Sequence, residues 1–298
     1  MERLPKVLAV VGTNASGKSA LGIELAKKYG GEIISADSRQ VFRGLDLGSG
    51  KVTPEEMQGV PHHLIDVREP NEFFSMADFQ KMSYAAIEGI RGRGRLPMIV
   101  GGTGLYVDSV LDGYLLSDKE PDLAYRAELE KLTTPELYEM LLRLMPDAQV
   151  EKNNRNRVMR MIERIHDGDD AVPSKQKRYE SLRLGVSWPR DVLGRRIDER
   201  LERRLEEGMI EEVQGLMDRG ATTEFLLGLG LEYRFITQHL LGEMGREEML
   251  EKLAIAIKQF AKRQMTWFRR NPDIVWLDMA GDSMDQACEA VEAFLKDE

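Results

Sequence analysis

The sequence predicts an α/β fold, in which a parallel β-sheet carrying a phosphate-binding loop (P-loop) is flanked by helices and interrupted by a helical insertion domain. Apolar strand-like runs alternate with helical patterns through the first hundred residues, and a glycine-containing loop joins the first strand to the first helix. Between residues 117 and 180 there is no convincing strand, only charged helical segments broken by prolines. We therefore assign 1–116 and 181–298 to the P-loop core and 117–180 to the insertion.

The N-terminal elements follow one another in the order strand, helix, strand. "KVLAVVG" (6–12) has the pattern of a buried strand, and "KSALGIELAKKYG" (18–30) that of a helix ending at a glycine pair. "GEIISAD" (31–37) is the second strand. A helix is predicted over 75–94, and Pro97 leads into the strand of "MIVGGTG" (98–104). This order implies right-handed crossovers and a ligand site at the carboxyl ends of the strands.

After the insertion the chain is expected to return to the sheet. "YESLRLGVSW" (179–188) is predicted to be a strand, and 192–220 one long amphipathic helix. Two more helical stretches and a last strand, "DIVWLD" (273–278), follow. The apolar face of the long helix is formed by Leu193, Ile197, Leu201, Leu205 and Val213.

Composition limits the class of protein. With 298 residues, 42% of them hydrophobic and 31% charged, the chain is expected to be a soluble protein of one large or two ordinary domains. A single cysteine, Cys288, excludes a disulfide framework and suits a cytoplasmic location. No apolar run approaches the roughly 20 residues that span a bilayer, and we see no signal peptide. We therefore expect no membrane partner.

Charge is unevenly distributed along the chain. The net charge of −9 argues against an extensive nucleic-acid-binding surface. However, "KQFAKRQMTWFRR" (258–270) carries five positive charges and no acid, and "NNRNRVMRMIER" (153–164) carries four arginines against one glutamate. Any nucleic-acid site is therefore expected to be local, at these two segments.

The first loop fits the pattern G-x-x-x-x-G-K-[ST] in full and stands between a strand and a helix, as its mechanism requires. Backbone N–H groups and the helix N-terminus can hold phosphate oxygens, the lysine adds a full charge, and the final hydroxyl can ligate magnesium. The motif predicts a bound diphosphate or triphosphate without naming the reaction. Its residues are Gly12, Thr13, Asn14, Ala15, Ser16, Gly17, Lys18 and Ser19.

Asp37 follows the second strand and should face the same crevice. Its position alone leaves two readings open, a functional carboxylate or the N-cap of a following helix. The adjacent His62 and His63 lack the partners of a metal site, and we interpret them as structural.

Several longer strings are similar to the tRNA dimethylallyltransferases (tRNA isopentenyltransferases), bacterial type. "ISADSRQV", "GVPHHLID" and "KRQMTWFRR" carry the resemblance, together with "LPMIVGGTGLYV" and "RIDERLERRLEEGMIEEV". It covers most of the chain outside the insertion. It implies transfer of a dimethylallyl group from dimethylallyl diphosphate to the exocyclic N6 of the adenosine 3′ to a tRNA anticodon, with release of diphosphate.

The resemblance also implies roles for single residues. The P-loop would hold the diphosphate with Mg²⁺ on Ser19, and Asp37 would take the proton of the adenine amine. Thr103 and Arg196 would lie at the catalytic centre, although charge pattern alone makes a solvated helix arginine equally plausible for Arg196. The residues expected to touch tRNA are Asp37, Ser38, Arg39, Gln40, Asn156, Arg157, Arg160, Lys262, Arg263 and Arg269.

The insertion is expected to contact the anticodon stem-loop, with the target base extruded. An arginine-rich helix is otherwise usually a solvated face, and Trp267 and Phe268 suit a core as well as an RNA surface. "EKNN" (151–154) and "HDGDDAVPSKQKR" (166–178) depart from the family's pattern, which affects the choice of tRNA more than the chemistry. The alternatives are a P-loop kinase of small molecules or nucleosides, an adenylate isopentenyltransferase acting on free nucleotides, and a non-catalytic nucleotide switch. We expect a monomer.

Overall fold

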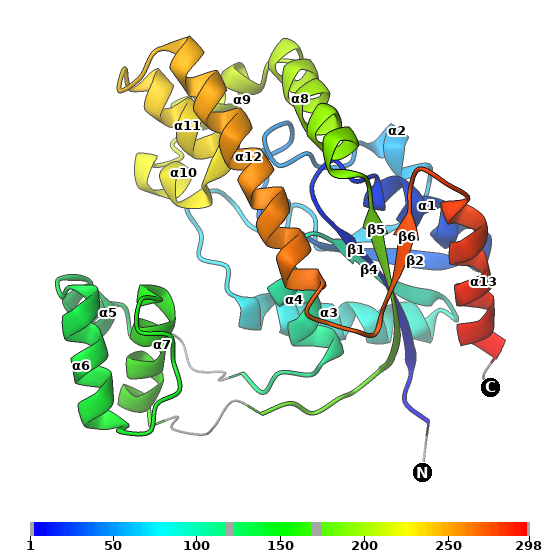
Figure 1. Cartoon of the computed structure of the whole chain (residues 1–298), viewed down its shortest axis with the longest axis horizontal. Helices are drawn as coiled ribbons and strands as arrows, with labels where there is room; N and C mark the ends of the chain where they lie inside the picture. The colour runs from blue at the N-terminus through cyan, green and yellow to red at the C-terminus, as the bar shows by residue number, and fades with distance from the viewer. Residues whose placement is uncertain (1–2, 117–121, 169–173, 297–298) are drawn as a thin grey trace. The chain divides into compact units, whose positions relative to one another are not determined.

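The core sheet confirms the predicted parallel arrangement. The computed structural model describes residues 3–116, 122–168 and 174–296. Every pair of neighbouring strands is parallel, so all their carboxyl ends lie at one edge (Figure 1). The spatial order is β3-β2-β4-β1-β5-β6, for β1 (Lys6–Gly12), β2 (Gly31–Ala36), β3 (His62–His63), β4 (Leu96–Gly101), β5 (Glu180–Ser187) and β6 (Ile274–Asp278).

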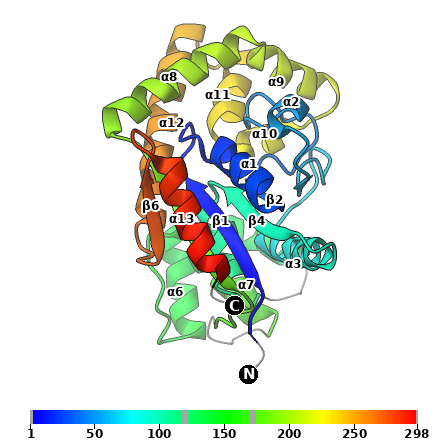
Figure 2. The ribbon, with the colours of Figure 1, turned by 90° about the vertical axis from the view of Figure 1, so that its right-hand side faces the viewer.

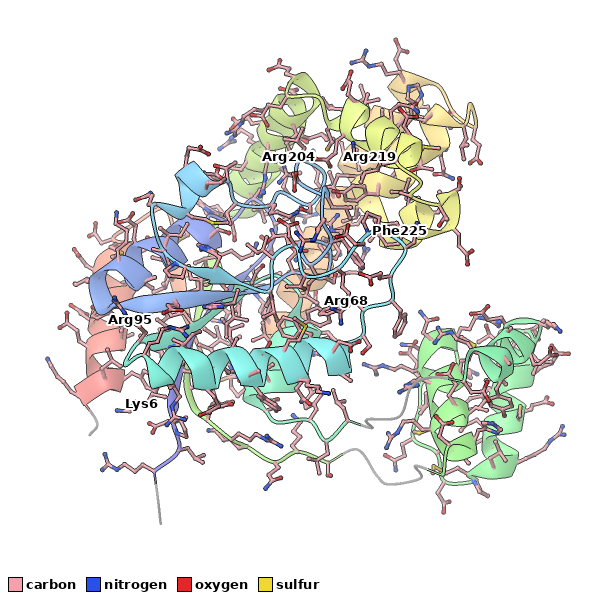
Figure 3. The ribbon with its side chains drawn as sticks, turned by 180° about the vertical axis from the view of Figure 1, so that it is seen from behind. Lys6, Arg68, Arg95, Arg204, Arg219 and Phe225 are labelled. Carbon is pink, nitrogen blue, oxygen red and sulfur yellow. The ribbon has the colours of Figure 1, made fainter. Side chains whose placement is uncertain are left out.

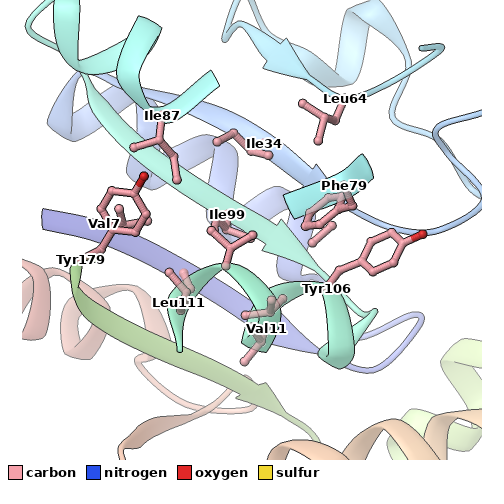
Figure 4. Packing of buried hydrophobic residues seen from close by; sticks show 14 of the residues in the cluster. Val7, Val11, Ile34, Leu64, Phe79, Ile87, Ile99, Tyr106, Leu111 and Tyr179 are labelled. Atoms are coloured by element: carbon pink, nitrogen blue, oxygen red, sulfur yellow. The ribbon is translucent and has the colours of Figure 1, made fainter. Parts of the chain in front are cut away.

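Helices cover both faces of the sheet, because successive side chains of its central strands are apolar and point to opposite faces. Along β1, Val7 and Val11 point into one hydrophobic cluster and Leu8 into another. The first cluster lies under α3 (Met76–Gly92) and α4 (Gly104–Leu111), where Phe79 stacks on Tyr106 at 4.2 Å (Figure 4). The second lies under α1 (Lys18–Tyr29) and α13 (Ser283–Lys296) (Figure 2).

A cluster of C-terminal helices packs beyond the carboxyl ends of the strands. It contains α8 (Arg190–Glu206), α9 (Met209–Asp218), α10 (Thr223–Leu229), α11 (Leu231–Leu240) and α12 (Arg246–Phe268), and the short α2 (Pro54–Met57) precedes β3. Ile197, Leu201 and Val213 are buried here, and Leu193 and Leu205 pack against them, as their spacing predicted.

The prediction of one long helix over 192–220 is wrong. The chain leaves the helix at Glu207, and Gly208 adopts φ 99°, a left-handed conformation that glycine accepts readily. The turn folds α9 back so that Val213 reaches the same core. Two helical stretches were expected after this region, and the structure has three, α10, α11 and α12, because Gly230 separates α10 from α11.

The insertion forms a unit of its own. Its helices are α5 (Leu123–Glu130), α6 (Thr134–Leu144) and α7 (Arg155–His166), packed around Leu137, Leu141 and Ile162. The chain divides into Met1–Gly113 with Lys177–Glu298, and Tyr114–Gln176. The predicted limits of 117 and 180 therefore lie a few residues too late, because an antiparallel bridge of Tyr114 with Lys175 starts the insertion and Glu180 already begins β5.

Candidate active site

The P-loop is fixed by side chains from distant parts of the core. Gly17 adopts φ 87° at the start of α1, which turns the loop into the helix. The N–H of Asn14 donates to Gln264 Oε1 at 2.9 Å, and the loop carbonyl of Ser16 accepts from Trp188 Nε1 at 2.9 Å. These bonds hold the backbone in place before any ligand arrives.

A cleft opens at the carboxyl ends of the strands, next to this loop. Four residues of the P-loop line it beside Asp37: Asn14, Ala15, Lys18 and Ser19. The charged residues that line it are Lys18, Asp37, Arg39, Arg200, Arg204 and Glu232. A cleft in this position is the usual ligand site of a parallel α/β sheet.

Asp37 is not a helix N-cap. Residues 38–41 form a turn, and the carboxylate Oδ1 of Asp37 accepts the N–H of Arg39 at 2.9 Å. Thr103 stands beside it as the first residue before α4. Its hydroxyl accepts the N–H of Ser38 at 3.2 Å, and its own N–H donates to Ala36 at 3.0 Å. The structure therefore brings Asp37, Ser38 and Thr103 together.

The cations of the cleft influence one another. Burial, followed by the charge of Arg200, lowers the pKa of Lys18 to about 8, against the opposing effect of Asp37. Burial and then the charge of Arg204 lower the pKa of Arg200 to about 10. Burial and repulsion between like charges thus disfavour the protonated forms of Lys18 and Arg200, and a bound anion would stabilise them.

Arg200 and Arg204 were not predicted from the sequence. They follow Arg196 at intervals of four residues, so the three share one face of α8, and Figure 3 labels Arg204 on this helix. The i, i+4, i+8 spacing could have identified them. Arg196 donates from Nε to the P-loop carbonyl of Ala15 at 2.9 Å and lies 4.7 Å from the ring of Trp188. It lines a second cavity, which shares Lys18 and Ser19 with the cleft.

Two residues predicted to touch tRNA have protein partners. Arg39 forms an ion pair with Glu232 at 2.5 Å. Gln40 is buried, where its Oε1 accepts from Ser35 at 2.8 Å and its Nε2 donates to Gly50 at 3.2 Å. The position of Gln40 favours a role in holding the 46–51 loop, which no local signal in the sequence indicated.

The predicted basic residues Lys262 and Arg263 are exposed on α12, and Arg269 is exposed at the C-cap of this helix. The aromatic residues between them pack inward. Phe268 is buried, and Trp267 donates from Nε1 to Asp108 at 2.7 Å. The structure thus shows the expected aromatic packing, with the cations left on the surface.

In the insertion, Asn156 and Arg157 are exposed on α7. Arg160 is half-buried and pairs with Glu163 at 3.2 Å. Asn156 and Arg157 are therefore accessible on the surface of the insertion, whereas Arg160 forms an ion pair inside the same helix.

The histidines have structural contacts. His62 Nδ1 lies 2.8 Å from the carbonyl of Val60, and His63 Nε2 lies 2.8 Å from Glu32 Oε2. In the part of the chain that the structure describes, no group of three or more His, Cys, Asp or Glu side chains could hold a metal ion. The helices of that part are also too short or too polar to cross a membrane.

Comparison with known proteins gives consistent matches over nearly the whole chain. A family model described as IPP transferase matches residues 40–271. The chain is 46% identical over 295 residues to tRNA dimethylallyltransferase 2 of Shewanella sediminis (strain HAW-EB3), covering 96% of this chain and 97% of the relative.

Solved structures agree. The chain is similar to the full-length tRNA isopentenylpyrophosphate transferase from Bacillus halodurans, with a TM-score of 0.74 and 39% identity over 98% of this chain and 95% of that one. It is also similar to a eukaryotic dimethylallyltransferase described as acting on tRNA, with a TM-score of 0.83 and 26% identity over 99% of this chain and 80% of that one.

Proposed function

The chain belongs to the IPP transferase family, whose members similar to it are tRNA dimethylallyltransferases, and from this we propose its reaction. The enzyme transfers a dimethylallyl group from dimethylallyl diphosphate to N6 of the adenosine 3′ to a tRNA anticodon. The observation that carries this proposal is that Asp37 and the P-loop residue Lys18 line one cleft. A base and a diphosphate-binding loop thus share one cleft, so both can act on the same transfer of the dimethylallyl group.

The bond changes balance without a further reactant. The bond between the allylic carbon and the diphosphate oxygen breaks, and its electron pair leaves with the diphosphate. The lone pair of N6 forms the new carbon–nitrogen bond. The N6 proton passes to Asp37, since the amine is nearly non-basic and needs a base as the bond forms.

The cations around the P-loop lower the barrier to departure of the diphosphate. Negative charge on the diphosphate grows as the carbon–oxygen bond breaks, and Lys18, Arg196 and Arg200 line the two cavities at the loop. Fixed positive groups of this kind stabilise charge that develops in the transition state. Burial lowers the pKa values of Lys18 and Arg200, so these two groups are largely desolvated before the diphosphate binds and little rearrangement is needed.

The oxygen atoms at the loop fit a magnesium ion. The Oδ1 of Asn14 is buried without a hydrogen-bond partner among the described residues and lines the cleft together with Ser19. Alcohol and amide oxygens suit Mg²⁺, which commonly completes its shell with phosphate oxygens and water. We therefore propose that Ser19 ligates Mg²⁺, which when bound would neutralise charge on the diphosphate.

We further propose that the adenosine is extruded from the anticodon loop to reach Asp37, as chemistry on a stacked base requires. The flanking nucleotides would lie at Ser38, and at the exposed Lys262, Arg263 and Arg269. Asn156, Arg157 and Arg160 of the insertion would contact the anticodon stem-loop. The enzyme would act as a cytoplasmic monomer.

The proposal is tested by incubating the protein with labelled dimethylallyl diphosphate and unmodified total tRNA, with AMP and ATP as parallel acceptors. We expect label in tRNA, at an adenosine next to the anticodon, and none in the free nucleotides. Label on AMP alone would identify an adenylate isopentenyltransferase. Consumption of ATP without label transfer would identify a kinase.

A further inference from the structure

A buried carboxylate on α11 lies in the cleft and takes no part in the proposed transfer. Glu232 is 3% exposed. Its Oε2 accepts from Arg39 Nη1 at 2.5 Å, and its Oε1 lies 3.8 Å from Arg204 Nη1. The junction before it is strained, because Leu231 takes φ 43°. The fold thus tolerates an unfavourable backbone conformation at the residue before Glu232, which lies in the cleft.

Positively charged side chains outnumber negatively charged ones in the lining of the cleft. Among the described residues, Lys18, Arg39, Arg200 and Arg204 are cations, whereas Asp37 and Glu232 are the acids. A buried guanidinium left unpaired is strongly disfavoured. If Glu232 were lost, Asp37 would be the one remaining acid in this lining that a freed arginine could pair with.

Arg39 is best placed to do so. It follows Asp37 by two residues, and its N–H already donates to the carboxylate at 2.9 Å. Burial acts to lower the pKa of Arg39, but the charges of Glu232 and then Asp37 raise it above its ordinary value. Both carboxylates therefore attract this guanidinium, and in the structure Glu232 holds it.

We propose that Glu232 is a positioning residue that keeps the guanidinium of Arg39 away from Asp37, so that Asp37 stays free to accept the N6 proton. The inference rests on the proposed role of Asp37. A guanidinium paired directly with Asp37 would occupy its oxygen atoms. It would also stabilise the charged carboxylate and so weaken it as a base by about tenfold to a thousandfold.

The test is Glu232→Gln, which keeps the shape of the side chain and removes its charge. At saturating tRNA and dimethylallyl diphosphate, we expect kcat to fall by about tenfold to a hundredfold, with smaller changes in both KM values. A matched control is Glu212→Gln on α9. Its carboxylate accepts the N–H groups of Leu47 and Gly48 at 2.6 and 3.0 Å and lies outside the cleft lining. This variant should keep kcat.

A second comparison separates positioning from a structural role. In an Arg39→Met background the competing guanidinium is gone, so adding Glu232→Gln should change kcat by less than about twofold. This double variant removes both partners of the Arg39–Glu232 pair, although Arg204 still loses the carboxylate that lies 3.8 Å away. It leaves one fewer buried guanidinium without an acid than the single variant does, so it is expected to fold even where the single variant does not. Wild-type kcat in Glu232→Gln, or a further large loss in the double variant, would overturn the inference.

A crystal structure of the Glu232→Gln variant gives a readout independent of turnover. We expect the guanidinium of Arg39 within hydrogen-bond distance of the Asp37 carboxylate, and a guanidinium turned to solvent would overturn the inference. If the wild-type protein transferred no label to tRNA, the proposed function would fail, and this structure would still decide the arrangement. If the wild type transferred label and Glu232→Gln did so equally fast, only the inference would fail.

Discussion

Affinity for dimethylallyl diphosphate should fall as the pH rises through about 8, because Lys18 loses its proton there. The pKa of this lysine is lowered from 10.5 to about 8 by burial and by Arg200. The charged fraction is then roughly nine-tenths at pH 7 and one-tenth at pH 9. If the charged form binds the diphosphate, affinity should drop by about tenfold between these pH values.

The direction of this change in affinity follows from the uptake of a proton on binding. The free protein has lost the Lys18 proton above pH 8, and the bound anion favours the charged form, so binding at pH 9 must take up nearly one proton. Isothermal titration calorimetry without tRNA, in buffers of different ionisation enthalpy, measures both the affinity and this uptake. The ionisation of the ligand itself is the same for every variant and cancels in comparisons.

Two variants make the measurement decisive. Lys18→Arg keeps its charge over this range and should bind with little dependence on pH. Arg200→Met removes a charge that lowers the pKa of Lys18, so its affinity should begin to fall at a higher pH. A wild-type affinity that is flat from pH 7 to 9, or an equal fall in Lys18→Arg, would refute the reasoning.

Three further predictions concern the base, the metal ion and the fold. Asp37→Ala should keep binding dimethylallyl diphosphate but lose about 10²- to 10⁴-fold in kcat, and a loss below tenfold in single-turnover assays would contradict its role as base. EDTA should abolish transfer and Mg²⁺ restore it, with Ser19→Ala needing more Mg²⁺ for half-maximal rate; unchanged activity in EDTA would exclude the metal. Hydrogen bonds from Arg93 lower the pKa of Glu32 to about 2, so the stabilisation is present at neutral pH and lost as the pH falls from about 4.5 to about 2. Glu32→Gln should therefore lower the melting temperature at pH 7, with a difference that shrinks over this acidic range, whereas a difference independent of pH would argue against the ion pair.

Local patterns in the sequence predicted most of the sheet and the P-loop. Strand periodicity and the glycine, lysine and serine spacing of residues 12–19 depend on neighbours in the chain, so they can be recognised without a fold. Asp37 was located by the same logic, at the end of a strand. The break at Gly208 was missed because a helical pattern of apolar residues continues on both sides of it.

The sequence alone determined that the chain forms a parallel sheet with a P-loop at its carboxyl edge, since the type and order of the elements and the loop motif can be recognised from residues close in sequence. Only the tertiary structure decided what surrounds that site. Glu232 reaches Arg39 across 193 positions, and Gln264 reaches the P-loop across 250. Contacts of this separation leave no periodic signal. They exist because packing of the C-terminal helices against the strand ends buries charges that must then find partners.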